Sequence, residues 1–187
     1  MDVFEKAIEF AVKAHSGAVR KNGNVPFILH PMEVAAIAGT MTSDRETLAA
    51  AVLHDTVEDA DVSGEEIESN FGKRVAALVA SETENKRREM SPAESWTARK
   101  EESLAVLKGS KDRNVKIIWL SDKLANVRSF VREKQKRGNA IWLDFNQKDV
   151  SKQAWYYRTI AEYTKELCET DAWREYAALV NKLFEGV

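Results

Sequence analysis

Four side chains of this sequence combine the two ligand types from which proteins often build a hydrolytic metal centre. His54 and Asp55 are adjacent, while His30 lies upstream and Asp122 far downstream. Imidazole nitrogen and carboxylate oxygen together suit manganese, iron, zinc or magnesium, and carboxylates favour the harder ions. Two ionised aspartates also balance the charge of one divalent cation. These residues therefore predict a single metal site, with coordination positions left for water and a substrate oxygen.

Two further carboxylates, Glu58 and Asp59, follow the His-Asp pair. Glu58 lies four residues after His54, and Asp59 lies four residues after Asp55, so on a helix each shares a face with its partner. Carboxylates beside a cation-activated water can orient that water, accept its proton or protonate a leaving group. Crowding of like charges is expected to raise at least one of their pKa values. We therefore predict Glu58 and Asp59 to be catalytic.

The elements that must position these side chains are helices, because apolar residues recur at three- and four-residue spacing. No segment alternates apolar and polar residues over six positions, so no strand is expected. The sequence predicts an all-α single domain over residues 1–187, a bundle of about eight to ten helices. The predicted helices span residues 2–15, 30–39, 47–58, 63–71, 112–136, 147–168 and 171–184, with one around 75–79 and one that starts at 91–94 and ends at Gly109.

The helix predicted over 47–58 has an almost unbroken apolar centre at 48–53, as expected of an element buried on several sides. Neighbours on a helix point about 100° apart, so His54 and Asp55 can face one cation only at the edge of this helix. His30 and Asp122 must then come from two other helices packed against it. A charged cluster on a core helix also needs partners, because unpaired buried charge is costly.

Composition narrows the class of protein further. The 187 residues include 28 basic and 30 acidic ones, with a net charge of −2, which argues against a general nucleic-acid binder. No apolar run approaches the roughly 18 residues that a membrane span needs. Residues 1–6 lack the features of a signal peptide. The single cysteine, Cys168, forms no internal disulfide and is expected to pack in the core. We therefore expect a cytoplasmic protein without membrane or nucleic-acid partners; a homodimer stays open.

Longer motifs around these residues resemble the HD-domain superfamily of metal-dependent phosphohydrolases. Within it they are similar to the guanosine tetraphosphate (ppGpp) hydrolase branch, which comprises the hydrolase domain of bifunctional alarmone synthetase/hydrolases and the small alarmone hydrolases. The resemblance covers residues 4–130, and residues 131–187 are expected to complete the bundle. The matching stretches are Ala14-His15-Ser16-Gly17, Arg20-Lys21-Asn22-Gly23, Pro26-Phe27-Ile28-Leu29-His30-Pro31, Ala50-Ala51-Val52-Leu53-His54-Asp55-Thr56-Val57-Glu58-Asp59, Phe71-Gly72 and Leu120-Ser121-Asp122-Lys123-Leu124-Ala125-Asn126-Val127-Arg128.

This resemblance implies a reaction, the removal of pyrophosphate from the 3′ position of (p)ppGpp or a related purine alarmone. It implies one manganese(II) ion as cofactor and a small nucleotide as partner. It also implies that Glu58 and Asp59 handle the hydrolytic water, that Arg20 and Lys21 lie over the nucleobase, and that Asn126 contacts the sugar or phosphates. The implied manganese ligands are His30, His54, Asp55 and Asp122.

Departures from the family pattern keep other substrates open. Ser121 and Ala125 differ from the usual residues of the last motif, and 83–86 only loosely matches a lysine-containing turn. One alternative is an HD phosphatase acting on another nucleotide, such as NADPH or a nucleoside monophosphate. The other is a catalytically inert nucleotide-sensing module. The presence of Glu58 and Asp59 argues against this alternative.

Side chains near the motifs also have structural interpretations. His15 is expected to be structural, and Arg128 to pair with an acid. Lys123 and the basic stretch 96–100 could reach phosphate or simply belong to the helix surface. The aromatic run 155–157 is expected to pack in the core or to cover the rim of the pocket.

Overall fold

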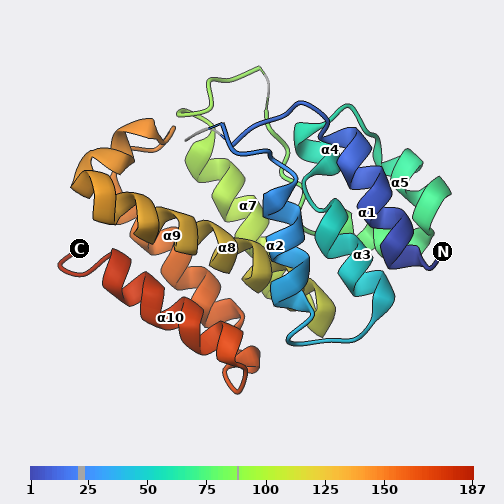
Figure 1. The fold of residues 1–187 in the computed structure, drawn as a ribbon. Coiled ribbons are helices and arrows are strands. Elements are labelled where there is room, and N and C mark those ends of the chain that lie inside the picture. Colours follow the sequence, from blue (N-terminus) through green and yellow to red (C-terminus); the bar gives the residue numbers. More distant parts are fainter. Residues whose placement is uncertain (21–23, 88) are drawn as a thin grey trace.

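The computed structural model describes residues 1–20, 24–87 and 89–187, and its regular elements there are helices (Figure 1). An isolated antiparallel bridge joins Val19 to Pro26. The all-α prediction is confirmed. The α-helices are α1 (Val3–Ala14), α2 (Leu29–Ala38), α3 (Arg45–Leu53), α4 (Thr56–Asp59), α5 (Gly64–Phe71), α6 (Lys73–Ala80), α7 (Trp96–Gly109), α8 (Arg113–Arg137), α9 (Val150–Tyr163) and α10 (Asp171–Leu183), and the 3-10 helices are η1 (Gly138–Asp144) and η2 (Lys165–Leu167).

The long helix α8 connects the two sides of the bundle. It contacts α2 and α3 on one side and α9 and α10 on the other. In Figure 1, α1, α3, α4 and α5 lie to the right and α9 and α10 to the left, with α2, α7 and α8 between them. The middle of α8, including Asp122, is therefore enclosed by both groups of helices.

Helix α3 is fixed at its start and buried along its length. The Asp44 carboxylate accepts hydrogen bonds from the Glu46 backbone N–H at 3.3 Å and the Thr47 hydroxyl at 2.6 Å, which caps the helix. Arg74 of α6 pairs with Asp44 and Glu46, at 2.6 Å each. All residues from 47 to 53 are buried. This rigid element delivers the His-Asp pair to the interior.

The predicted helix over 47–58 is divided in the structure, which corrects the prediction. Helix α3 ends at Leu53 and α4 begins at Thr56. The Thr56 hydroxyl donates to the Leu53 carbonyl at 2.6 Å, and His54 Nδ1 lies 2.8 Å from the Ala51 carbonyl. Side chains that bind nearby carbonyl groups compete with the regular helix ladder. His54 and Asp55 therefore stand at a join between two helices.

Three other boundaries differ from the sequence prediction. The capping box at Ser91 and Glu94 forms, with both reciprocal hydrogen bonds at 3.3 Å, but it closes a turn and α7 begins only at Trp96. The predicted helix over 147–168 becomes α9 and η2. Residues 138–144, for which no helix was predicted, form η1.

The core is aromatic towards the C-terminal end. Trp142 stacks on Phe184 with ring centroids 5.4 Å apart, and Tyr157 stacks on the same ring at 6.0 Å. Trp96 and Trp119 are also buried. Cys168 is exposed, so the expectation of a packed core thiol was wrong; it follows η2, in the connection to α10.

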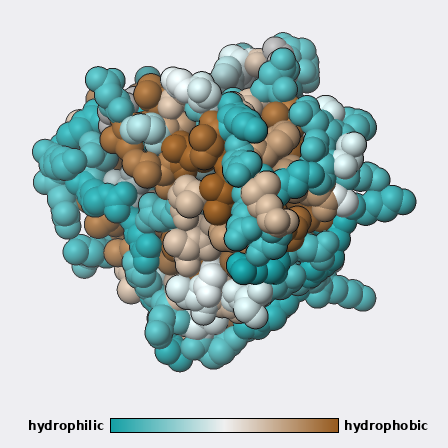
Figure 2. Space-filling model, turned by 45° about the vertical axis from the view of Figure 1, so that its right-hand side comes forward, coloured by the Kyte–Doolittle hydropathy of each residue, from teal (hydrophilic) through white to brown (hydrophobic). Residues whose placement is uncertain are grey.

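No described helix has the length and apolar character needed to cross a membrane. On the face shown in Figure 2, hydrophobic residues gather near the middle and hydrophilic residues surround them.

Candidate metal centre

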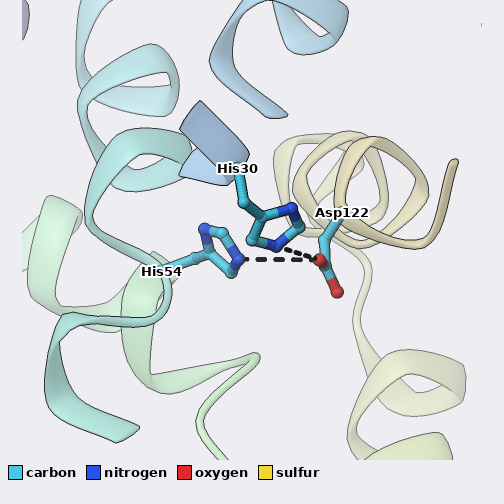
Figure 3. Close-up of side chains that lie close together, drawn as sticks. All are labelled: His30, His54 and Asp122. Carbon is cyan, nitrogen blue, oxygen red and sulfur yellow. Dashed lines mark ion pairs between the residues drawn. The ribbon is translucent and has the colours of Figure 1, made fainter. Parts of the chain in front are cut away.

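Three side chains from different parts of the fold meet in the interior (Figure 3). His30 stands near the start of α2, His54 directly after α3, and Asp122 in the middle of α8. The Oδ1 atom of Asp122 lies 2.9 Å from His30 Nε2 and 3.6 Å from His54 Nε2. All three residues are buried, and one ligand atom from each lies within 4.8 Å of the others. Such a group is suited to hold a metal ion.

Asp55 joins this group from the α3–α4 join. Its Oδ2 atom lies 3.2 Å from His54 Nε2 and 3.5 Å from His30 Nε2. The structure thus brings together all four side chains that the sequence analysis named as ligands. Their coordination of a cation stays a prediction.

The hydrogen bonding of His54 fits a cation as its partner. Its Nδ1 atom faces the Ala51 carbonyl, which can only accept, so Nδ1 is the donor there and Nε2 is the atom turned towards the other candidate ligands. That Nε2 atom is buried and has no hydrogen-bond partner among the described residues. A histidine ligand commonly donates its second N–H to a backbone carbonyl in this way. With two nitrogens and two carboxylates converging, the residues present fit a divalent metal ion.

The electrostatics of the group also favour a positive charge at its centre. Burial, the largest single influence, lowers the pKa of His54, but the carboxylates of Asp55 and Asp122 together raise this pKa well above its usual value. Burial raises the pKa of Asp55, yet His54 and His30 bring it down to about 2. The pKa of Asp122 also lies well below its usual value, because Lys123 and the two histidines outweigh burial. The field that favours a proton on His54 would favour a metal cation as well.

Glu58 and Asp59 stand at the rim of this site, on α4. Burial raises the pKa of Glu58, and the Glu84 and Asp55 carboxylates raise it further. The Glu84 backbone N–H donates to Glu58 Oε2 at 3.3 Å, and Lys86 Nζ lies 3.5 Å from Oε1. Asp59 is exposed and pairs with the same lysine. A pocket of about 410 Å³ opens here, lined by Val57, Glu58, Thr83, Glu84, Asn85, Lys86, Arg87 and Glu89.

The predicted substrate residues bind one another. Arg20 Nη2 donates to Asn126 Oδ1 at 3.1 Å, and Asn126 Nδ2 donates to Asp122 Oδ1 at 2.7 Å. The Arg20 guanidinium also lies over the Phe27 ring, 5.7 Å from its centroid. Asn126 is therefore linked directly to a candidate ligand, and Arg20 is linked to that ligand through Asn126. Lys21, the third predicted substrate residue, lies outside the described residues.

Sequence reasoning missed Glu82, which is buried beside the candidate ligands. Lys123 Nζ donates to Glu82 Oε1 at 3.1 Å and binds Asp122 Oδ2 as well. Burial raises the pKa of Glu82 to about 7, although Lys123 lowers it. The available signal was the alternation of charged residues at 82, 84 and 86 in a stretch outside the helices.

The basic stretch 96–100 faces a carboxylate. Arg99 Nη1 lies 2.8 Å from Glu84 Oε2, and Lys100 binds Oε1 of the same group. Lys100 Nζ also lies 4.7 Å from the Tyr156 ring centroid. The side chains of Arg99 and Lys100 are therefore bound to protein groups and do not form a solvated helix face.

Other residues named from the sequence have structural contacts. Arg128 pairs with Glu175 at 2.6 Å and with Glu33 at 3.3 Å, so the acid pairing is confirmed. His15 is buried, with its ring centroid 4.7 Å from that of Phe27. Tyr156 and Tyr157 are buried in the core, whereas 39% of Trp155 is exposed. Ser121 and Ala125, the departures in the last motif, are both buried.

Comparisons with known proteins agree with this architecture. The HD domain family model matches residues 7–147. The chain is 38% identical over 136 residues to the guanosine-3′,5′-bis(diphosphate) 3′-pyrophosphohydrolase of Aquifex aeolicus, covering 71% of this chain and 19% of that protein. It is 32% identical over 142 residues to the GTP pyrophosphokinase of Myxococcus xanthus, covering 73% and 19%. The chain thus spans about a fifth of the length of these relatives.

Solved structures share the fold. A metazoan SpoT ortholog, described as hydrolysing ppGpp, superposes with a TM-score of 0.78 over 100% of this chain and 98% of its own, at 23% identity. A protein of Listeria monocytogenes EGD-e gives a TM-score of 0.70 at 31% identity over 83% of this chain and 94% of its own. With the family model matching most of its length, this chain belongs to the HD domain family.

Proposed function

We propose that this protein is a divalent-metal-dependent phosphohydrolase that removes the 3′-pyrophosphate from (p)ppGpp or a related purine alarmone. The observation that carries the proposal is the buried convergence of two imidazole Nε2 atoms with the carboxylates of Asp55 and Asp122. The name of the Aquifex relative, a 3′-pyrophosphohydrolase, supports the substrate class. We further propose manganese as the cation, a cytoplasmic location, and one domain over residues 1–187.

The four converging side chains would hold the cation, His30 and His54 through Nε2 and the aspartates through Oδ atoms. A bound divalent ion neutralises phosphate charge and makes water a stronger nucleophile near neutral pH. Asn126, which donates to Asp122 Oδ1, keeps that carboxylate in place. Side chains at the rim of the site would then handle the proton of the attacking water.

Glu58 is the side chain best placed to accept the proton of the attacking water. Its raised pKa makes it a stronger base than an ordinary glutamate once it is ionised. Its carboxylate is also held, by the Glu84 backbone N–H and the Lys86 ammonium. Asp59 binds the same lysine and so helps to keep that lysine beside Glu58.

The anionic substrate would approach along the side that carries Arg20 and Lys86. A guanidinium plane can stack on a purine base, and Arg20 already lies over one aromatic ring. Its partner Asn126 has an amide that can hydrogen-bond a sugar hydroxyl or phosphate oxygen. Lys86 lines the pocket beside Glu58, where an ammonium can attract a phosphate group.

The test is a product assay with purified protein and manganese chloride. The panel contains (p)ppGpp, (p)ppApp, NADPH and nucleoside monophosphates. Release of pyrophosphate from the first two supports the proposal. Orthophosphate from NADPH or a monophosphate would reassign the substrate, and tight nucleotide binding without turnover would make the protein a sensing module.

A further inference from the structure

Three charged side chains alternate in the non-helical stretch after α6, and each binds a different helix. Glu82 binds Lys123 of α8, and Glu84 binds Arg99 and Lys100 of α7. Lys86 binds the acids of α4. The stretch therefore joins the helix that carries Asp122 to the helix that carries Glu58, and its first contact lies closest to the candidate ligands.

The ammonium group of Lys123 is in contact with protein groups. Its ammonium binds Asp122 Oδ2, donates to Glu82 Oε1 at 3.1 Å, and lies 5.0 Å from the centroid of the Trp119 ring. Only 13% of its side chain is exposed, and 4% of that of Glu82. Two carboxylates and one aromatic ring thus surround a largely buried ammonium, which leaves little access for a phosphate. Lys123 therefore interacts with other side chains of the protein and not with the substrate.

The two oxygens of Asp122 consequently have separate roles. Oδ2 is held by Lys123, while Oδ1 faces His30 Nε2 at 2.9 Å and accepts from Asn126 Nδ2 at 2.7 Å. Rotation of the carboxylate plane away from this orientation would break both sets of contacts. Partners of this kind, one step removed from the ion, orient ligands in metal sites.

We propose that Lys123 and Glu82 are positioning residues: Glu82 fixes Lys123, and Lys123 fixes the Asp122 carboxylate so that Oδ1 faces the cation. This inference rests on the proposed function, since it assigns a role at the same metal site. It adds a residue, Glu82, that none of the matching motifs contains.

The experiment measures manganese affinity by calorimetric titration of the full chain with manganese chloride, without nucleotide. The variants are Lys123→Met, Glu82→Gln and the double change. If the pair positions Asp122, each single variant weakens binding by roughly 10- to 100-fold, and the double variant is no weaker than the poorer single one.

A charge effect alone gives a different pattern. Loss of the Lys123 ammonium would then tighten binding of a cation, and loss of the Glu82 carboxylate would weaken it. Tighter or unchanged manganese binding by Lys123→Met therefore overturns the proposal. Lys123→Gln, which is also neutral but polar, replaces Lys123→Met if the latter does not fold, and the same signs apply.

Matched controls come from the same helix. Lys116 is also 13% exposed and pairs with Glu166 of η2. Lys116→Met and Glu166→Gln should leave manganese affinity unchanged within twofold. An equal loss in these controls would mean that any ion pair made by a lysine of α8 has the effect, which contradicts a specific positioning role.

The titration also separates this inference from the proposed function. Wild-type protein that binds manganese but hydrolyses no nucleotide refutes the proposed reaction, and the variants still decide the positioning role. Wild-type protein that binds no divalent cation refutes both.

Discussion

His54 Nε2 lies 3.2 Å from Asp55 Oδ2, although the two residues are neighbours in sequence. Side chains of successive helical residues point about 100° apart, so two neighbours can face one point only at the edge of a helix. At the join between α3 and α4 both residues keep right-handed helical backbone angles, with φ −54° at His54 and φ −91° at Asp55. The His-Asp pair is thus formed where one helix passes into the next.

Asp55→Ala should abolish hydrolysis and weaken manganese binding while leaving the fold intact. The side chain supplies one candidate ligand, is 19% exposed, and makes no capping hydrogen bond to α4. The product assay, calorimetric titration and circular dichroism check these three parts of the expectation in turn. Asp61→Ala, at a nearby exposed acid, is the control. Retained activity in Asp55→Ala would contradict the metal assignment.

Glu58→Ala should lower turnover far more than substrate binding. Removal of a general base typically costs about 10²- to 10⁴-fold in rate, whereas the cation and the basic groups that bind phosphate remain. Steady-state kinetics with the nucleotide that proves to be the substrate give kcat and KM separately. A comparable loss in both constants would demote Glu58 from base to binding residue.

Lys86→Met should move the acidic limb of the pH–rate profile to higher pH. Burial, Glu84 and Asp55 raise the pKa of Glu58, and Lys86 opposes them. Without the lysine this pKa rises further, so a base that must be ionised becomes available only at higher pH. Profiles of kcat for the wild type and the variant, with Lys73→Met as an exposed control, measure the shift. A limb that moves to lower pH would exclude Glu58 as the group observed.

Asp44→Ala should lower the free energy of unfolding by about 1–2 kcal/mol at neutral pH through loss of the α3 cap. Hydrogen bonds from Arg74, with further ones from Thr47 and the Glu46 backbone, lower the Asp44 pKa from 3.8 to about 2. A lowered carboxyl pKa stabilises the fold above the unfolded value and less as pH falls between the two values. Urea unfolding at pH 7 and below pH 3 should show the difference between wild type and variant narrowing in acid.

The helices and the candidate ligands could be predicted because both follow from local pattern. Apolar spacing and the residues at helix ends located α1, α2 and α8 within a residue or two, and the rare histidines together with aspartates identified the ligand types. Asp122 lies far from the other ligands in the sequence, and the motif that carries the family resemblance names it as well. Its position in the middle of α8 agrees with that motif.

The remaining features depend on contacts that local sequence does not encode. The helix ends at Leu53 because the His54 and Thr56 side chains bind carbonyl groups, a competition that helix periodicity cannot reveal. Glu82 meets Lys123 only after α6 and α8 have packed. Pairing between residues so distant in sequence is a property of the folded chain.

The candidate ligands sit on segments that are far apart in the unfolded chain, at the beginning of α2, the α3–α4 join and the middle of α8. An ion bound to ligands from all three segments acts as a removable cross-link, and it must dissociate before the helices can separate. Linkage then gives about 2.7 kcal/mol of added stability at free ion concentrations a hundred times the Kd. Treatment with a chelator should accordingly lower the melting temperature of the wild type and leave that of Asp55→Ala nearly unaltered, so thermal melting reports metal loading before any substrate is known.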